Sequence, residues 1–218
     1  MIGLKITSYE GYGFLNYLAI VVFFMLFLSI FNPLTTVSAM KTAKETLATS
    51  QTSVKTFESG NFGFSLNYPK DWRVMKEYTH ESQEMSTVAI SPDLNKMNDN
   101  IREMVVVTAV HSDSKDYSLN DYIEESISDI KNLFGNAIIV NDIGDENISD
   151  TRGHSYLLSL NSHIPDIQLN SYQTFIIHDN QMYAVSYIGG AEYQYYFSIA
   201  KDIMKSLHFN DVIAAFAA

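Results

Sequence analysis

The sequence predicts an α+β fold in which helices pack on an antiparallel-rich β-sheet. Short apolar runs with a period of two residues, typical of strands, recur through much of 57–188. Only two stretches of 57–209 have the spacing of a long amphipathic helix; one lies between groups of strands and the other follows the last strand. A doubly wound α/β fold would need a helix between most strands, so this order favours an α+β sandwich.

The stretch Phe62–Trp72 is expected to begin the sheet. Aromatic and aliphatic residues alternate with small or polar ones over 62–68, which predicts a strand buried on one face. Pro69 suits the second position of a tight turn, and the turn leads to Trp72, the only tryptophan. We expect a second strand over 72–75 and a substantially buried Trp72.

The next segments are expected to alternate between loops and strands. Polar residues over 77–84 and 93–103 predict loops, with a short strand at 86–90 between them. Met104–Val110 is a nearly continuous β-branched run. Such runs are typical of strands covered on both faces, so this is the expected central strand.

A helix is expected after Ser118, which forms the start of a capping-box pattern with Asp121. Gly135 is a suitable end for it. Apolar residues fall on one face of this helix, as expected for docking on a sheet: Leu119, Ile123, Ile127, Ile130 and Phe134.

In the second half of the domain, the sequence predicts more strands and a closing helix. Asp179 and Asn180 tolerate positive φ, so they predict a tight type I′ hairpin between two long strands. A polar stretch is noted at 144–153 and a loop at 161–166. The expected strands are 137–143, 154–160, 168–178 and 181–188, and the final helix is 191–207.

The N-terminus predicts membrane targeting. No residue between Glu10 and Lys41 is charged, and 14–31 is almost wholly apolar, long enough for a bilayer span of about 17–25 residues. Small residues at 37–39 suit cleavage of a signal peptide, so two alternatives stay open for 1–39: a signal peptide or a single-span anchor. We expect a linker at 40–56, one domain at 57–209, and a short apolar tail at 210–218, with the domain outside the cytoplasm.

Charge and cysteine content exclude several classes. The net charge is −11, whereas a nucleic-acid-binding domain needs a basic face. The excess is local, because 77–150 carries sixteen acidic and four basic residues. The absence of cysteine excludes disulfides, zinc–thiolate sites and a cysteine nucleophile.

Three stretches give the domain a resemblance to the PsbP-like family: Phe62–Trp72, Asn180–Val185, and Ile203–Phe209. The last differs from the family's Ser-Phe ending because Leu207 and His208 intervene. The resemblance implies an α+β sandwich, similar also to Mog-type Ran-binding proteins. PsbP itself helps to retain calcium and chloride in photosystem II, but no motif here marks its ion-linked residues, so that role does not transfer.

Two groups of side chains are candidates for binding. Asp142, Asp145, Glu146 and Asp150 form the densest acidic group, and an oxygen-lined site there would suit Ca²⁺ or Mn²⁺. It lacks the ligand order of an EF-hand loop. The second group could form a protein interface, since tyrosine combines apolar area with a polar tip: Tyr187, Tyr193, Tyr195 and Tyr196.

Catalytic motifs are lacking in the sequence. The six histidines form no His-Glu-x-x-His pattern, and no Gly-x-Ser-x-Gly elbow occurs. We therefore expect a non-catalytic, membrane-targeted domain that binds or supports a protein or membrane complex. The alternatives are an accessory protein that binds a divalent cation or small ligand and, as a minor one, a hydrolase.

Overall fold

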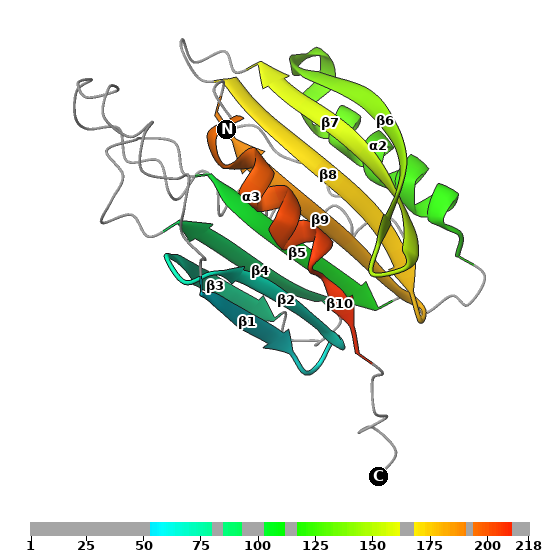
Figure 1. The fold of residues 1–218 in the computed structure, drawn as a ribbon. Coiled ribbons are helices and arrows are strands. Elements are labelled where there is room, and N and C mark those ends of the chain that lie inside the picture. Colours follow the sequence, from blue (N-terminus) through cyan, green and yellow to red (C-terminus); the bar gives the residue numbers. More distant parts are fainter. Residues whose placement is uncertain are drawn as a thin grey trace, which may run out of the picture.

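The computed structural model describes residues 53–79, 85–92, 103–111, 117–161, 168–190 and 194–210. These ranges form two antiparallel sheets and two α-helices (Figure 1). The smaller sheet has the strand order β1 (Val54–Ser59), β2 (Phe64–Pro69), β10 (His208–Phe209). The larger has the order β3 (Trp72–Thr79), β4 (Met85–Pro92), β5 (Met104–His111), β9 (Gln181–Gly189), β8 (Gln168–His178), β7 (Thr151–Asn161), β6 (Ile138–Ile148).

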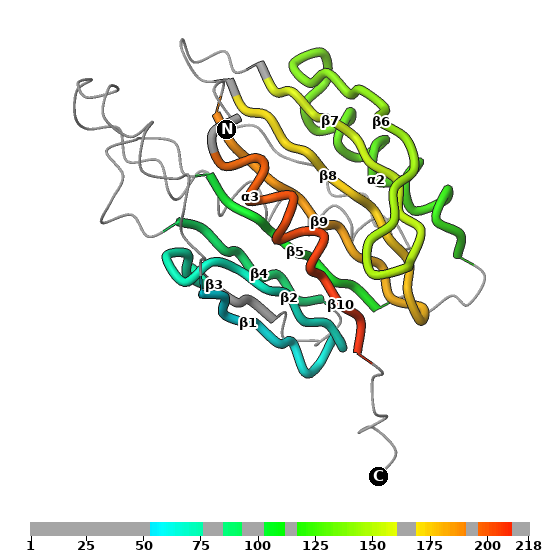
Figure 2. The backbone as a smooth tube through the Cα atoms, in the orientation of Figure 1, coloured from blue at the N-terminus to red at the C-terminus, as the bar shows by residue number. Residues whose placement is uncertain are grey.

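The large sheet separates two layers. On its front face, defined by Val107 and Val185, lie the small sheet and helix α3 (Gln194–Lys205), as Figures 1 and 2 show. On its back face, defined by Met182 and Phe175, lies helix α2 (Leu119–Phe134). A short 3₁₀ turn, Gly135–Ala137, joins α2 to β6. The α+β class, with antiparallel sheets covered by helices, is therefore confirmed.

β5 is a buried interior strand of the large sheet, as the sequence predicts. β5 lies between β4 and β9, and each residue of Met104–Val110 is buried. Trp72 is also buried, at 1% exposure, and its ring meets Tyr196 of α3 edge-on at 5.8 Å. The interior of the front face is thus shared by strand and helix residues from both ends of the domain.

Helix α2 and the hairpin β8–β9 confirm the local signals. Ser118 accepts a hydrogen bond from the Asp121 amide, and the Asp121 carboxylate accepts one from the Ser118 amide, which completes the capping box. Asp179 and Asn180 have φ of 48° and 60°, as a type I′ turn requires.

Three segments differ from their predictions. β3 continues to Thr79, into the polar stretch expected to be a loop, because pairing with β4 needs only backbone groups. The polar stretch 144–153 is part of one long hairpin, in which β6 and β7 meet at a turn formed by Ser149 and Asp150. β1 starts at Val54, inside the predicted linker.

Several predictions lie outside the described residues. These are the membrane-targeting segment, most of the linker, most of the loops at 93–103 and 161–166, the start of the last helix, and nearly all of the tail. Within the described ranges, no helix has the length and apolar character needed to span a bilayer. The choice between signal peptide and anchor therefore stays open.

Replacing Trp72 with alanine should cost about 3–5 kcal/mol in the free energy of unfolding, because a large buried ring leaves a cavity. The control is Val54→Ala, which changes a side chain that is 63% exposed and should stay within about 0.5 kcal/mol of the parent. Denaturant unfolding of both variants measures the difference. Equal midpoints for Trp72→Ala and the parent would contradict this packing.

Gly153 marks a close approach of β7 to β8. A Cβ at this position would lie 2.9 Å from Thr174 Cγ2 and 3.0 Å from the Phe175 carbonyl oxygen. Gly153→Ala should therefore lower stability by about 1–3 kcal/mol, whereas Gly60→Ala, with no atom within 4 Å of the new methyl, should not. Thermal unfolding of both variants tests this. An unchanged unfolding temperature for Gly153→Ala would show that β8 can move away from the added methyl group at little cost.

Candidate functional site

The four acidic residues of the predicted cation site lie on the β6–β7 hairpin. Asp142, Asp145 and Glu146 belong to β6, and Asp150 lies in the turn with a φ of 62°. A β-bulge between Asp142 and Gly144 shifts the register against β7, and Gly144 has a φ of 103°. Because of this extra residue, Asp142 and Asp145 face the same side of the hairpin, and Glu146 faces the other.

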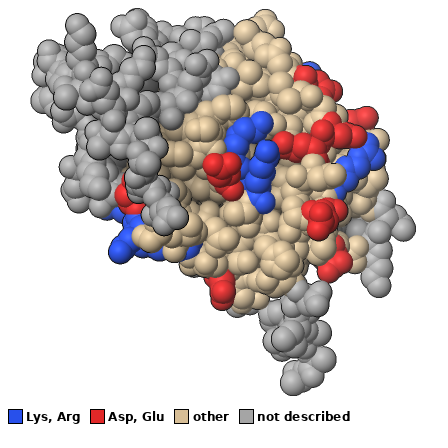
Figure 3. All heavy atoms as spheres, viewed as in Figure 1, with Lys and Arg blue, Asp and Glu red and all other residues tan. Residues whose placement is uncertain are grey.

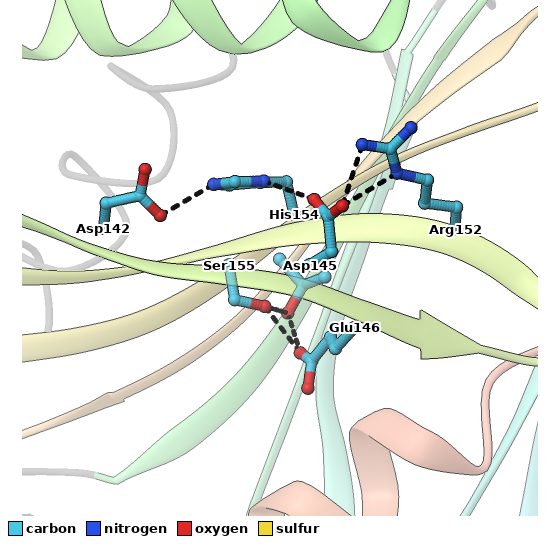
Figure 4. A network of polar contacts seen from close by, with 7 residues as sticks. Asp142, Asp145, Glu146, Arg152, His154 and Ser155 are labelled. Atoms are coloured by element: carbon cyan, nitrogen blue, oxygen red, sulfur yellow. Dashed lines mark hydrogen bonds and ion pairs between the residues drawn. The ribbon is translucent and has the colours of Figure 1, made fainter.

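His154 of β7 lies between Asp142 and Asp145 (Figure 4). Its Nδ1 is 2.7 Å from Asp145 Oδ1, and its Nε2 is 2.8 Å from Asp142 Oδ1. A neutral imidazole can donate from only one nitrogen, so two carboxylate partners require the imidazolium form. Arg152 completes the row by donating from Nε to Asp145 Oδ2 at 3.0 Å.

The charges of this row shift two pKa values in opposite directions. Partial burial, the largest single influence on His154, would lower its pKa, but hydrogen bonds to Asp145 and Asp142 and their negative charges together raise it above 6.5. Hydrogen bonds from His154 and Arg152 lower the pKa of Asp145 below 3.8. The row is therefore a network of ion pairs.

Glu146 lies on the front side of the hairpin, away from His154 (Figure 4). Its Oε1 accepts hydrogen bonds from Ser155 Oγ at 2.6 Å and Thr174 Oγ1 at 2.7 Å. Partial burial would raise its pKa most, yet these hydrogen bonds and the charge of Lys201 on α3 outweigh burial and lower it. Glu146 thus joins β6 to β7 and β8 through hydrogen bonds, and Lys201 of α3 acts on it through charge alone.

The geometry divides the predicted cation ligands between two faces. Asp142 and Asp145 are paired with His154, whereas Glu146 is paired on the other side. In the part of the chain that the structure describes, no group of three or more His, Asp or Glu is placed to hold a metal ion. The Ca²⁺ or Mn²⁺ site at Asp142, Asp145, Glu146 and Asp150 stays a prediction without geometric support.

The predicted tyrosine interface is described only in part. Tyr187 is fully buried in the front-face core, and its hydroxyl donates to the Glu103 carboxylate, which also accepts from the Tyr196 amide at 3.3 Å. In this conformation Tyr187 offers no surface to a partner. Tyr193 and the Tyr195 side chain lie outside the described structure, so the interface stays a prediction.

A shallow hollow of about 460 Å³ lies between α2 and β7. Tyr156 lines it from β7, beside His154, and Glu124 and Lys131 line it from α2. Burial, together with the charges of Asp142 and Glu124, raises the pKa of Tyr156 and keeps its hydroxyl protonated. The hollow is open and has charges of both signs, so it does not select one class of small ligand.

The outer side of β6 is the most distinctive surface. β6 ends the large sheet and pairs with β7 alone among the described strands. Ile139 and Ile143 on it are 48% and 53% exposed, and Figure 3 shows acidic side chains gathered on this side of the molecule. Sequence reasoning missed this edge because it depends on the strand order of the sheet, and it missed the role of His154 because the contacts of His154 depend on the bulged register.

These features define a small α+β sandwich domain with an acidic open edge. The chain belongs to the PsbP-like protein family, whose model matches residues 18–207. None of the curated proteins matches the chain. The family resemblance seen in the sequence is therefore confirmed.

Solved structures are similar at low identity. The cyanobacterial PsbP of Synechocystis is 12% identical, with 82% of this chain and 99% of that chain covered and a TM-score of 0.47. LpqN of Mycobacterium tuberculosis, described as involved in cell envelope biogenesis, is 13% identical, with 74% and 86% covered and a TM-score of 0.45. A Bacteroides thetaiotaomicron protein is 13% identical with a TM-score of 0.45; the match covers 72% of this chain and spans about half (48%) of that protein.

The ion pairs of His154 predict a defined pH dependence. Folding raises the pKa of His154 above 6.5. The stabilisation from its protonated ring is therefore complete below pH 6.5 and is lost as pH rises through the pKa that His154 has in the folded state. Since the pKa of Asp145 is lowered, its share is complete above pH 3.8 and is lost as pH falls through its folded pKa. The pairs should stabilise the fold most between these limits.

Two measurements test this. NMR titration should find a midpoint for the His154 ring above pH 6.5. Thermal unfolding of His154→Gln should lose the corresponding pH dependence of stability. His208→Gln, which changes an exposed histidine on β10, is the control and should keep it. A His154 ring that titrates at or below 6.5 contradicts the double ion pair.

Proposed function

We propose that this chain is a non-catalytic, membrane-targeted PsbP-like protein whose domain lies outside the cytoplasm and binds or supports a partner protein or membrane complex. The family match carries the proposal. It runs over 18–207 and so begins inside the apolar stretch 14–31. The match therefore includes most of the apolar stretch together with the domain, which supports a domain held at or sent across a membrane.

The paired state of the polar groups supports binding over catalysis. His154 uses both ring nitrogens in ion pairs, and Glu146 is held by two hydroxyls. A general base or nucleophile needs a proton site directed at a substrate. Here these groups are directed at one another, which suits a rigid hairpin that presents a surface.

Cross-linking in native membranes tests the proposal. The full-length chain should be recovered with the same defined partner in repeated preparations. The Trp72→Ala variant, whose folded domain is destabilised by a cavity in the core, should recover less of that partner while it stays in the membrane fraction or the exported fraction. Recovery of identical proteins with both forms would show that the folded domain plays no part.

The same preparations test location. Protease added to the extracytoplasmic side of sealed membranes should digest the domain, whereas protease added to the cytoplasmic side should not. Digestion from the cytoplasmic side alone would overturn the proposed location.

A further inference from the structure

The edge strand β6 presents backbone groups that no described strand uses. It is an eleven-residue strand at the end of the seven-stranded sheet, and its one described neighbour is β7. An edge strand leaves a row of N–H and C=O groups able to pair with another extended chain. The bulge at Asp142–Gly144 interrupts the strand, so the regular part of this edge is 138–142.

Two exposed apolar side chains lie on the edge strand itself. Of the described large apolar residues, four are clearly exposed, and three of them lie on β6 or at the end of α2: Ile139, Ile143 and Leu133. The fourth, Val54, lies on β1. Ile139 and Ile143 lie on the edge strand itself, and exposed apolar residues on an open edge suit a binding surface better than residues scattered over the molecule.

The same region carries a strong negative charge. Residues 117–161 contain eight Asp or Glu against Lys131 and Arg152, a net charge of −6, or −5 with His154 protonated. The other edge of the large sheet, β3, contains Arg73, Lys76 and Glu77. The two edges therefore differ in sign, and β6 would attract a basic partner.

We propose that the β6 edge binds an extended segment of a partner protein in which Lys or Arg alternates with apolar residues, and that the segment adds to the large sheet as a further strand. The proposal rests on the proposed partner-binding function and specifies its surface. A second copy of this chain fits less well, because pairing β6 with itself would bring Asp142, Asp145 and Glu146 of two molecules together.

The alternation follows from the pleat. Successive side chains of β6 point to opposite faces of the sheet, so Ile139 faces front and Asp142 faces back, toward His154. An added strand alternates in the same way. Its apolar side chains can pack beside Ile139, and its cations can approach Asp142, whose side chain stays 60% exposed while it pairs with His154.

A synthetic peptide tests the surface directly. A fluorescent peptide of about ten residues, in which lysine alternates with valine, spans the regular edge. Fluorescence anisotropy should show that it binds the full-length chain in mild detergent, and that binding weakens as salt is raised. The double variant Ile139→Ser/Ile143→Ser should bind about tenfold more weakly, because both exposed apolar contacts are lost.

Matched controls define the outcome. Val54→Ser, which removes an even more exposed apolar residue from β1, should bind the lysine–valine peptide as the parent does. A glutamate–valine peptide should bind neither form. Equal weakening by Val54→Ser and the β6 variant would overturn the proposal. Self-association that the β6 variant abolishes would assign the edge to a second copy and would overturn it as well.

Photo-cross-linking separates this inference from the proposed function. A photoreactive residue is placed at 139 in one form of the full chain and at 54 in another, in native membranes. Partner adducts at 139 and not at 54 support the β6 edge. Adducts at 54 alone would refute the inference about the β6 edge and would leave the proposed partner binding intact. If neither position gave adducts and general cross-linking recovered no partner, both the inference and the proposed function would be refuted.

Discussion

The architecture depends on the contact between the two ends of the domain at the front face of the large sheet. Phe64 of β2 pairs with Phe209 of β10, and the ring of Tyr183 from β9 packs against both. The Tyr183 hydroxyl donates a hydrogen bond to the Phe62 carbonyl at 2.9 Å. A three-stranded sheet with a two-residue third strand has little stability alone. The small sheet therefore exists because its apolar face is buried on β9, which also fixes where the chain leaves α3.

This constraint decides where a partner can bind. The front face is occupied by the small sheet and α3, and α2 occupies part of the back face. The β6–β7 hairpin extends the sheet beyond this core and is fixed on both sides, by His154 at the back and by Glu146 at the front. Each side uses ion pairs or charge-assisted hydrogen bonds, which hold β6 in a defined conformation. A fixed edge loses less entropy on binding than a loose one.

The sequence predicts the core better than the surface. β5, α2 and the β8–β9 turn follow from local signals: the buried β-branched run of Met104–Val110, the Ser118 cap, and the φ tolerance of Asp179 and Asn180. The candidate site depends on register, which periodicity does not reveal. Asp142 and Asp145 are three residues apart and would face opposite sides of a regular strand; the bulge at Gly144 places both beside His154. The polar half of the hairpin does not follow from the sequence for a different reason: an exposed edge strand needs no apolar alternation.

The central claim is that the folded domain, whose front face is covered by the small sheet and α3, offers strand β6 to a partner. Amide hydrogen exchange at the β6 edge tests it. In the purified full-length chain, amides of 138–142 that point away from β7 should exchange quickly, while amides of β5 and β9 exchange slowly because they are paired on both sides. In native membranes that contain the partner, the same β6 amides should become protected. Identical exchange at 138–142 in both settings, together with new protection elsewhere on the domain, would contradict the account.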